Sequence, residues 1–285
     1  MKKESSVLRH LPLALILLAA APAHAAERTL DRTFAVAPGG SLIVDADGAT
    51  VRVAGNDSNQ VVVHMLIRAS DEYLADTTLD AVQKGSDVTV TMRRSKRGWF
   101  SWGSGSSRQD IEVTVPRRFK VDVRTSGGSV ELRDTEGVTS LKTSGGDISA
   151  KNLTGSAVLR TSGGSVRADS IRGDVDAGTS GGDVRLLRID GKVRAKTSGG
   201  SVRCSLVGAN RGISASTSGG DVELTLPRGT TGNLEASTSG GDVRSDLPVT
   251  STVHEDSRLS GTINGGGEPI YAHTSGGSIS LRAEN

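Results

Sequence analysis

One short stretch of the sequence, RRSKRGWFSWGSGSSRQD at 93–110, brings together side chains that suit the recognition of a ligand. Arg97 precedes Trp99, Phe100 and Trp102, and the surrounding glycines and serines are typical of a loop. Aromatic rings beside arginine suit a membrane interface, a glycan or a protein partner. The alternative is that the loop folds back and its rings plug the end of the fold. Arg97, Trp99, Phe100 and Trp102 are the candidate binding residues.

No group of residues has the spacing of a known catalytic centre. Beyond residue 25 the histidines are His64, within an apolar run, His254, and His273, at an outward strand position. The sequence contains no H-E-x-x-H, no G-x-S-x-G, no Walker loop and no cysteine cluster. Acidic residues are plentiful, so a carboxylate pair acting on sugars stays open as an alternative. We expect no catalytic residue and no cofactor.

The most regular feature of the sequence is the tetrapeptide Thr-Ser-Gly-Gly, which recurs from Thr125 to Thr274. The first five copies are 18 residues apart, and the later steps are 20, 21 and 36 residues. A fixed period of this size indicates a solenoid, in which each repeat is one coil stacked on the next. The last step equals two periods, which predicts one degenerate copy near 250–265.

The paired glycines are expected to form one corner of each coil. Two glycines permit backbone angles that are closed to other residues, and they let the corners of successive coils approach closely. The neighbouring Thr and Ser can hydrogen-bond the backbone or stack as ladders. The glycines to which we assign this structural role are Gly127, Gly128, Gly145, Gly146, Gly163, Gly164, Gly181, Gly182, Gly199, Gly200, Gly219, Gly220, Gly240, Gly241, Gly276 and Gly277.

Apolar and polar residues alternate on both sides of each tetrapeptide. The fourth and second residues before the threonine are mainly Val, Ile, Leu or Ala, and the fifth residue after it is Val or Ile in every copy. A period of two predicts strands with one buried face. The sequence therefore predicts an all-β fold, a parallel β-solenoid of roughly 18-residue coils, each with two strands, a glycine corner and an outer turn.

Two finer regularities concern ligands. The coils lengthen at 205–213 and 225–233, on the side opposite the glycine corner, so this variable edge is the expected place of a specific site.

The residue after the glycines alternates between Ser and Asp through six copies, which keeps carboxylates two coils apart. A calcium ladder is the alternative, but the pattern G-G-x-G-x-D-x-U-x is absent, and we expect no metal.

The chain divides into three predicted parts. Residues 1–25 have a basic start, a short apolar run and the motif Ala-His-Ala, which indicate a removable export signal, with a membrane anchor as the alternative. Residues 26–118 are rich in strand patterns and are expected to form an N-terminal β-rich capping region, and residues 119–285 form the repeat solenoid.

Charge and cysteine usage limit the class of partner. Residues 26–285 hold 31 Lys+Arg and 31 Asp+Glu, which gives no general attraction to nucleic acid. The single cysteine, Cys204, stands where other copies carry Ala or Leu, so we interpret it as a small buried residue. A reactive thiol or an intermolecular bridge is the alternative.

These features together resemble a group of bacterial β-strand-repeat proteins of unknown function that are often labelled putative adhesins. The resemblance covers nearly the whole chain beyond residue 25. It implies an envelope or cell-surface β-solenoid without known enzymatic activity, and it brings no catalytic residues. Its motifs are RTFAVAPGGSLIVDADGATVRVAG at 32–55, IEVTVPRRFKVDVRTSGGSV at 111–130, the Thr-Ser-Gly-Gly series and INGGGEPIYAHTSGGSISLRAEN at 263–285.

The predicted function is a non-enzymatic exported protein whose β-rod presents a binding or adhesion surface at the bacterial cell envelope, in the periplasm or on the cell surface. The candidate partners are an envelope glycan, a membrane surface or a protein, and no nucleic acid is expected. Two alternatives are a polysaccharide-acting β-helix enzyme and a structural or stress-sensing envelope component without a ligand of its own. The oligomeric state is left open.

Overall fold

The computed structural model describes residues 26–95 and 107–284, and almost all of them lie in β-strands or in the turns between strands. Within these residues one short helix, α1 (Asp71–Ala75), interrupts the strands. No helix in this part of the chain is long and apolar enough to cross a membrane.

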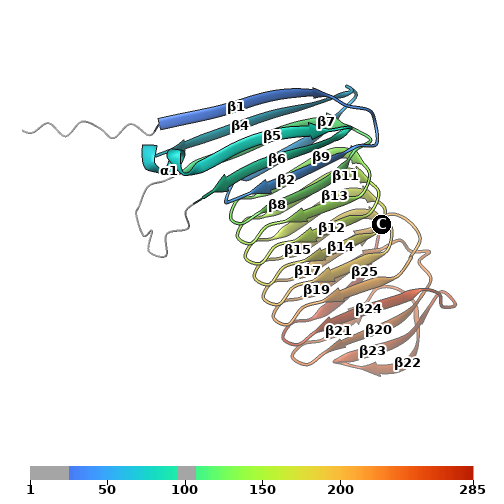
Figure 1. Cartoon of the computed structure of the whole chain (residues 1–285). Helices are drawn as coiled ribbons and strands as arrows, with labels where there is room; N and C mark the ends of the chain where they lie inside the picture. The colour runs from blue at the N-terminus through green and yellow to red at the C-terminus, as the bar shows by residue number, and fades with distance from the viewer. Residues whose placement is uncertain (1–25, 96–106, 285) are drawn as a thin grey trace, which may run out of the picture.

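The strands form two long sheets that enclose the core between them and run along the rod (Figure 1). Sheet A consists, in spatial order, of β1 (Ala26–Ala35), β4 (Gln60–Ala69), β7 (Arg108–Pro116), β3 (Thr50–Asn56), β9 (Val130–Glu136), β11 (Ile148–Thr154), β13 (Val166–Arg172), β15 (Val184–Asp190), β17 (Val202–Leu206), β19 (Val222–Leu226), β25 (Ile279–Ala283) and β21 (Val243–Ser245). Sheet B consists of β22 (Val249–Glu255), β23 (Arg258–Ile263), β20 (Gly232–Thr238), β24 (Pro269–Thr274), β18 (Ile213–Ser216), β16 (Val193–Lys196), β14 (Val175–Gly178), β12 (Ala157–Arg160), β10 (Thr139–Lys142), β8 (Lys120–Thr125), β2 (Ser41–Ala46), β6 (Asp87–Arg94) and β5 (Thr77–Lys84).

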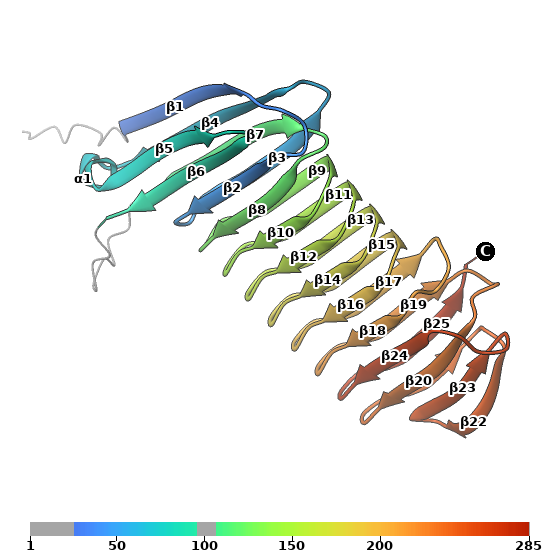
Figure 2. The same ribbon diagram turned by 45° about the vertical axis from the view of Figure 1, so that its right-hand side comes forward.

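Each coil contains one strand of sheet B, the glycine corner, one strand of sheet A and a return turn (Figure 2). Successive coils pair in parallel and in register, so that Val166 lies opposite Val184 and Ala157 opposite Val175. The predicted all-β parallel solenoid is therefore confirmed. At the N-terminal end the antiparallel strands β1 and β4 extend sheet A, and the β5–β6 hairpin extends sheet B.

The core of each coil is built from the inward residues of its two strands. Leu141 of sheet B and Ile148 of sheet A, which belong to one coil, are both buried. A buried side chain of this size contributes about 1.5–3 kcal/mol. Cys204 continues a column between Leu186 and Leu224 and is fully buried, as the sequence predicted. Burial raises the pKa of its thiol to about 12, so the thiolate needed for disulfide exchange is not formed near neutral pH.

The glycine corners are held by a ladder of hydrogen bonds between coils. Each repeat threonine is buried and donates its hydroxyl to a backbone carbonyl of the neighbouring coil, at 2.6 to 2.9 Å. The second glycine must lack a side chain because a Cβ would meet the carbonyl of its counterpart in the next coil, as at Gly146 over Gly128. None of the repeat glycines has a positive φ. The expectation that these glycines adopt backbone angles closed to other residues is therefore wrong as far as positive φ is concerned, and close approach is the reason for the second glycine of each pair.

The last coil does not lie at the end of the stack. Strands β24 and β25 are inserted between β18 and β20 in sheet B and between β19 and β21 in sheet A (Figure 2). The segment expected to be a degenerate copy, 250–265, lies instead in the antiparallel strands β22 and β23, which extend sheet B beyond β20. The spatial order of the coils cannot be predicted from strands that are so similar. Every coil presents the same pattern of backbone hydrogen-bonding groups to a parallel neighbour.

The inserted coil completes the alternation of Ser and Asp after the glycines. In sequence Asp221 is followed by Asp242, but in space Ser278 lies between them. Each side chain of this column except the last, Asp242, accepts a hydrogen bond from the backbone N–H one coil further on, as Asp221 does from Ser278 at 2.8 Å and Ser278 from Asp242 at 3.3 Å. The alternation thus holds along the whole stack. It separates the carboxylates and uses each of them within the fold.

Candidate binding groove at the variable edge

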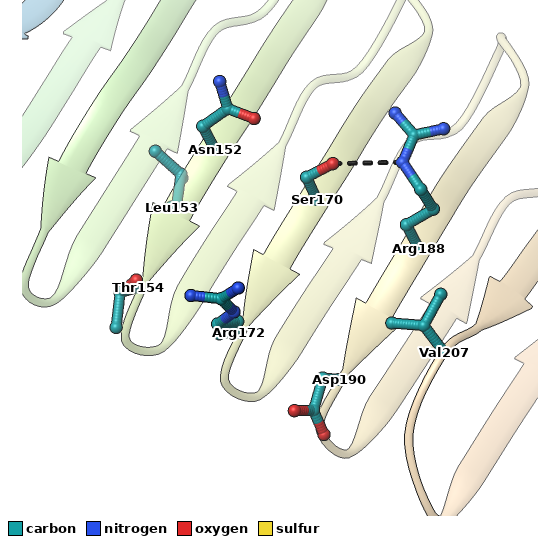
Figure 3. Close-up of a pocket in the computed structure, with 8 residues that line it drawn as sticks. All are labelled: Asn152, Leu153, Thr154, Ser170, Arg172, Arg188, Asp190 and Val207. Atoms are coloured by element: carbon teal, nitrogen blue, oxygen red, sulfur yellow. Dashed lines mark hydrogen bonds between the residues drawn. The ribbon is translucent and has the colours of Figure 1, made fainter.

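The residues that the sequence predicted to bind a ligand, Arg97, Trp99, Phe100 and Trp102, lie outside the described residues. The described part of the chain offers a different candidate, a groove on the edge opposite the glycine corners. The groove has a volume of about 410 Å³, and Figure 3 shows its lining. It is lined by Asn152, Leu153, Thr154, Ser170, Arg172, Arg188, Asp190 and Val207.

The groove lies on the variable edge, where a specific site is expected from the sequence. Its walls come from the ends of β11, β13 and β15, and Val207 begins the first lengthened turn. Val207 is 50% exposed, although most valines of the coils are buried. The coil stack therefore offers a hollow at the point where its regular return turns give way to longer ones.

A column of left-handed residues shapes this edge of sheet A. Asp134, Asn152, Ser170 and Arg188 each stand nine residues after a repeat threonine and have φ between 53° and 61°. A non-glycine residue in this region costs about 1 kcal/mol or more. Four coils carry the same strain, which bends each strand of sheet A before the return turn. Strain that recurs in one place is a reason to search that place for a function.

The groove lies where this column ends. Leu186 pairs with Cys204 and Ile189 with Leu206, so two residues of β15, Leu187 and Arg188, face one residue of β17. Strand β17 is therefore one residue short, and the left-handed position is missing from it. The backbone N–H of Arg188 donates instead to the hydroxyl of Ser205 at 3.0 Å. Arg188 and Val207, which flank this irregularity, both line the groove.

The two guanidinium groups of the groove differ in whether they have partners within the protein. Arg188 donates from Nε to the hydroxyl of Ser170 at 3.1 Å, the dashed line in Figure 3, and forms an ion pair with Asp169. Arg172 is exposed and, among the described residues, has neither an ion pair nor a side-chain hydrogen bond. A positioned cation beside a free one suits the binding of an anionic or polyhydroxylated ligand, because a guanidinium donates several hydrogen bonds in a fixed fork.

The acidic groups give the groove little scope for acid–base chemistry. Asp190 is the only carboxylate among its described lining residues, and it is paired with Arg211 at 3.3 Å. Glycoside hydrolysis usually requires two carboxylates that flank the bond to be broken. The residues that the structure describes also contain no group of three His, Cys, Asp or Glu side chains placed to hold a metal ion. Among its described lining residues the groove thus holds two guanidinium groups and one carboxylate, which is already paired.

These residues could not be recognised directly from the sequence. The left-handed positions carry Asp, Asn, Ser and Arg, which share no side-chain chemistry. The available signal was the length of β17, because an alignment of the coils on their buried residues leaves this strand one residue short. A local break in the repeat was therefore visible, but its effect on the surface required the pairing of the strands.

Comparisons with known proteins identify the architecture. The family described as Toastrack DUF4097 matches residues 41–282. No curated protein matches the chain significantly. Among solved structures, a putative adhesin from Bacteroides fragilis NCTC 9343 is similar at 13% identity and a TM-score of 0.42, over 90% of this chain and 97% of that one. A putative cell adhesion protein from Clostridium sporogenes ATCC 15579 is 14% identical at a TM-score of 0.30, over 90% and 100% of the two chains. A putative lipid binding protein from Parabacteroides distasonis ATCC 8503 is 12% identical at 0.42, over 89% and 96%.

Proposed function

This chain belongs to the Toastrack DUF4097 family, and from that premise we propose that it is an exported, non-enzymatic protein that presents a binding surface at the bacterial cell envelope. The stacked coils serve as a support that holds surface groups at fixed spacing along two sheets. Export rests on the signal-like residues 1–25, and the location is the periplasm or the cell surface.

The observation that carries this proposal is the groove at the variable edge. It is preformed by strained backbone, it holds one positioned and one free arginine, and its single carboxylate is already paired. A surface built in this way gains affinity from charge-assisted hydrogen bonds to its ligand. The same carboxylate argues against the polysaccharide-cleaving alternative, since a second acidic group is missing from the described lining.

The proposal predicts that purified residues 26–285 co-sediment with isolated bacterial envelopes, and that Arg172→Ser weakens this binding about tenfold. A hydrogen bond to a charged group contributes about 1.5–3 kcal/mol, and 1.4 kcal/mol corresponds to a factor of ten. The matched control is Arg244→Ser, because Arg244 is also an exposed arginine of sheet A but lies in β21 and pairs with Asp242.

The outcomes of the sedimentation assay separate the alternatives. If Arg172→Ser and Arg244→Ser bind envelopes equally well, the groove does not contribute to binding. Absence of binding by the unchanged protein would overturn the proposal and favour a structural or stress-sensing role. A variant with Trp99→Ser, Phe100→Ser and Trp102→Ser tests in the same assay the predicted aromatic stretch.

A further inference from the structure

The charges of the protein are unevenly distributed along the rod. Residues 26–285 hold equal numbers of basic and acidic side chains, yet residues 139–216, which span β10 to β18, hold 12 Lys+Arg against 6 Asp+Glu. These central coils therefore carry an excess of six positive charges. A charge excess on one part of a neutral protein creates a local field that attracts ions of the opposite sign.

The acidic side chains of these coils are engaged within the fold. Asp169, Asp176 and Asp190 form ion pairs with arginines of this segment. The other three accept hydrogen bonds from backbone N–H groups of the neighbouring coil, at 2.7 to 3.0 Å; they are Asp147, Asp174 and Asp183. Three of the six carboxylates are thus paired with arginines, and the other three form no ion pair with a basic side chain of the described residues.

Many basic side chains of the same coils are unpaired. On sheet A they are Lys151, Arg167, Arg172 and Arg185. On sheet B they are Lys142, Arg194 and Lys196. We call these seven residues the basic belt. Within the described residues none of them has an ion pair or a side-chain hydrogen bond, and all but the half-buried Arg185 are exposed. The free charge thus faces solvent on both sides of the rod.

The arrangement of the arginines on sheet A opposes the stability of the free protein. Arg167 lies opposite Arg185, and Arg185 lies opposite Arg203, so three guanidinium groups stand on adjacent strands about 4.8 Å apart. Like charges at this separation repel. Only Arg203 of the three is paired, with Glu223 at 2.7 Å. The column of Ser129, Asp147 and their successors avoids such contacts by alternation, so adjacent charge is not a necessary result of stacking.

We propose that the basic belt binds a linear acidic polysaccharide of the envelope. Carboxylate, sulfate or phosphate groups recurring along a sugar chain would pair with the guanidinium forks and relieve the repulsion between Arg167 and Arg185. The groove adjoins the belt through Arg172, so the glycan is the ligand class of the same surface. This inference rests on the proposed binding function and adds the chemistry of the ligand.

Two other polyanions fit the belt less well. Residues 139–216 contain no aromatic side chain, so the coils provide no platform on which the bases of a single-stranded nucleic acid could stack. A membrane is flat and would contact the belt on one sheet only, whereas the free cations occupy both sheets. A flexible chain can follow the rod and reach both sides.

The test uses residues 26–285 and fluorescently labelled polygalacturonate, a linear glycan with a carboxylate on each sugar, followed by fluorescence anisotropy. We expect binding that weakens steeply with added salt, and no binding to neutral dextran. The variant Lys151→Gln, Arg167→Gln and Arg185→Gln is expected to bind about tenfold more weakly at low salt, with a shallower salt dependence. The control variant Lys84→Gln, Arg118→Gln and Lys120→Gln removes the same charge from unpaired sites outside the belt and is expected to bind like the unchanged protein.

The outcomes distinguish failure of this inference from failure of the proposed function. If both variants bind polygalacturonate equally weakly, the glycan is attracted by the net charge of the protein, and the claim that the basic belt is its binding site is overturned. Binding to anionic phosphatidylglycerol vesicles or to single-stranded DNA at least as tight as to the glycan would overturn the ligand class. Binding to envelopes without binding to polygalacturonate or to dextran sulfate would overturn the inference and leave the proposed function standing. Failure to bind envelopes at all would overturn both.

Discussion

Replacement of Gly164 by alanine is expected to destabilise the coil stack by about 3 kcal/mol or more, whereas the same change at the adjacent Gly163 is expected to cost less than about 1 kcal/mol. A Cβ at Gly164 would overlap the carbonyl oxygen of Gly146 and approach its carbonyl carbon to 2.5 Å. At Gly163 the nearest atoms would lie 3.4 and 3.5 Å away, which is close to ordinary contact.

The steric overlap at Gly164 cannot be removed by a small movement of its neighbours. The two nearest atoms belong to the backbone of the neighbouring coil, and only the third, Oδ1 of Asp147 at 2.7 Å, belongs to a side chain. The carbonyl of Gly146 also accepts the hydroxyl of Thr161 at 2.8 Å, so moving the carbonyl away would break a buried hydrogen bond of the corner ladder. Urea unfolding followed by circular dichroism measures both variants. Equal destabilisation at the two glycines would contradict the view that close approach, and not backbone angle, requires them.

Deletion of residues 264–285 is expected to release the whole C-terminal end of the solenoid, not only its last coil. Strands β24 and β25 are internal, and they provide the parallel neighbours of β20 and β21. Without them, β20 and β21 lose the parallel neighbours that join them to the stack, and β22 and β23 are attached to it only through β20. Limited proteolysis with mass spectrometry should therefore find new cleavage sites within 227–263, while 120–226 stays protected as in the full chain.

Two double-cysteine variants check the cause of this effect in the full-length protein. Ser216 lies opposite His273, and His273 lies opposite Ser237. A disulfide is therefore expected to form between cysteines at 216 and 273, and not between cysteines at 216 and 237, which are two coils apart. The native Cys204 is fully buried and is not expected to take part. Bridging of 216 to 237 would show that the coils stack in sequence order.

The strands and corners could be predicted because each depends on a local pattern. Inward residues such as Val166 and Leu159 alternate with outward ones, and that alternation fixes which face of a strand is buried. The place of the last coil could not be predicted in this way, since hydrogen bonds between parallel coils are alike at every step. One clue was present: Asp221 and Asp242 break the alternation in sequence, and the intervening coil restores it in space.

The site was less accessible to prediction. The groove depends on left-handed residues that share no chemical type, and on a strand that is one residue short. The basic belt was hidden by the balance of charge over 26–285, because a sum over the chain cancels a local excess. The belt becomes visible when the charges are added up coil by coil and the acidic groups that already form ion pairs are set aside. The binding role of the aromatic stretch stays a prediction from the sequence; its residues are Arg97, Trp99, Phe100 and Trp102.

Arginine modification by phenylglyoxal shows whether the basic belt and the groove form the binding surface. Residues 26–285 are modified with and without bacterial envelopes, and the modified arginines are identified by mass spectrometry. We expect Arg167, Arg172 and Arg185 to react in the free protein and to become protected when envelopes are bound. Arg118 and Arg244, which are exposed but lie outside the belt, should react equally in both samples. Uniform protection of all five arginines, or bound protein in which the first three stay reactive, would contradict the claim that this surface is the binding site.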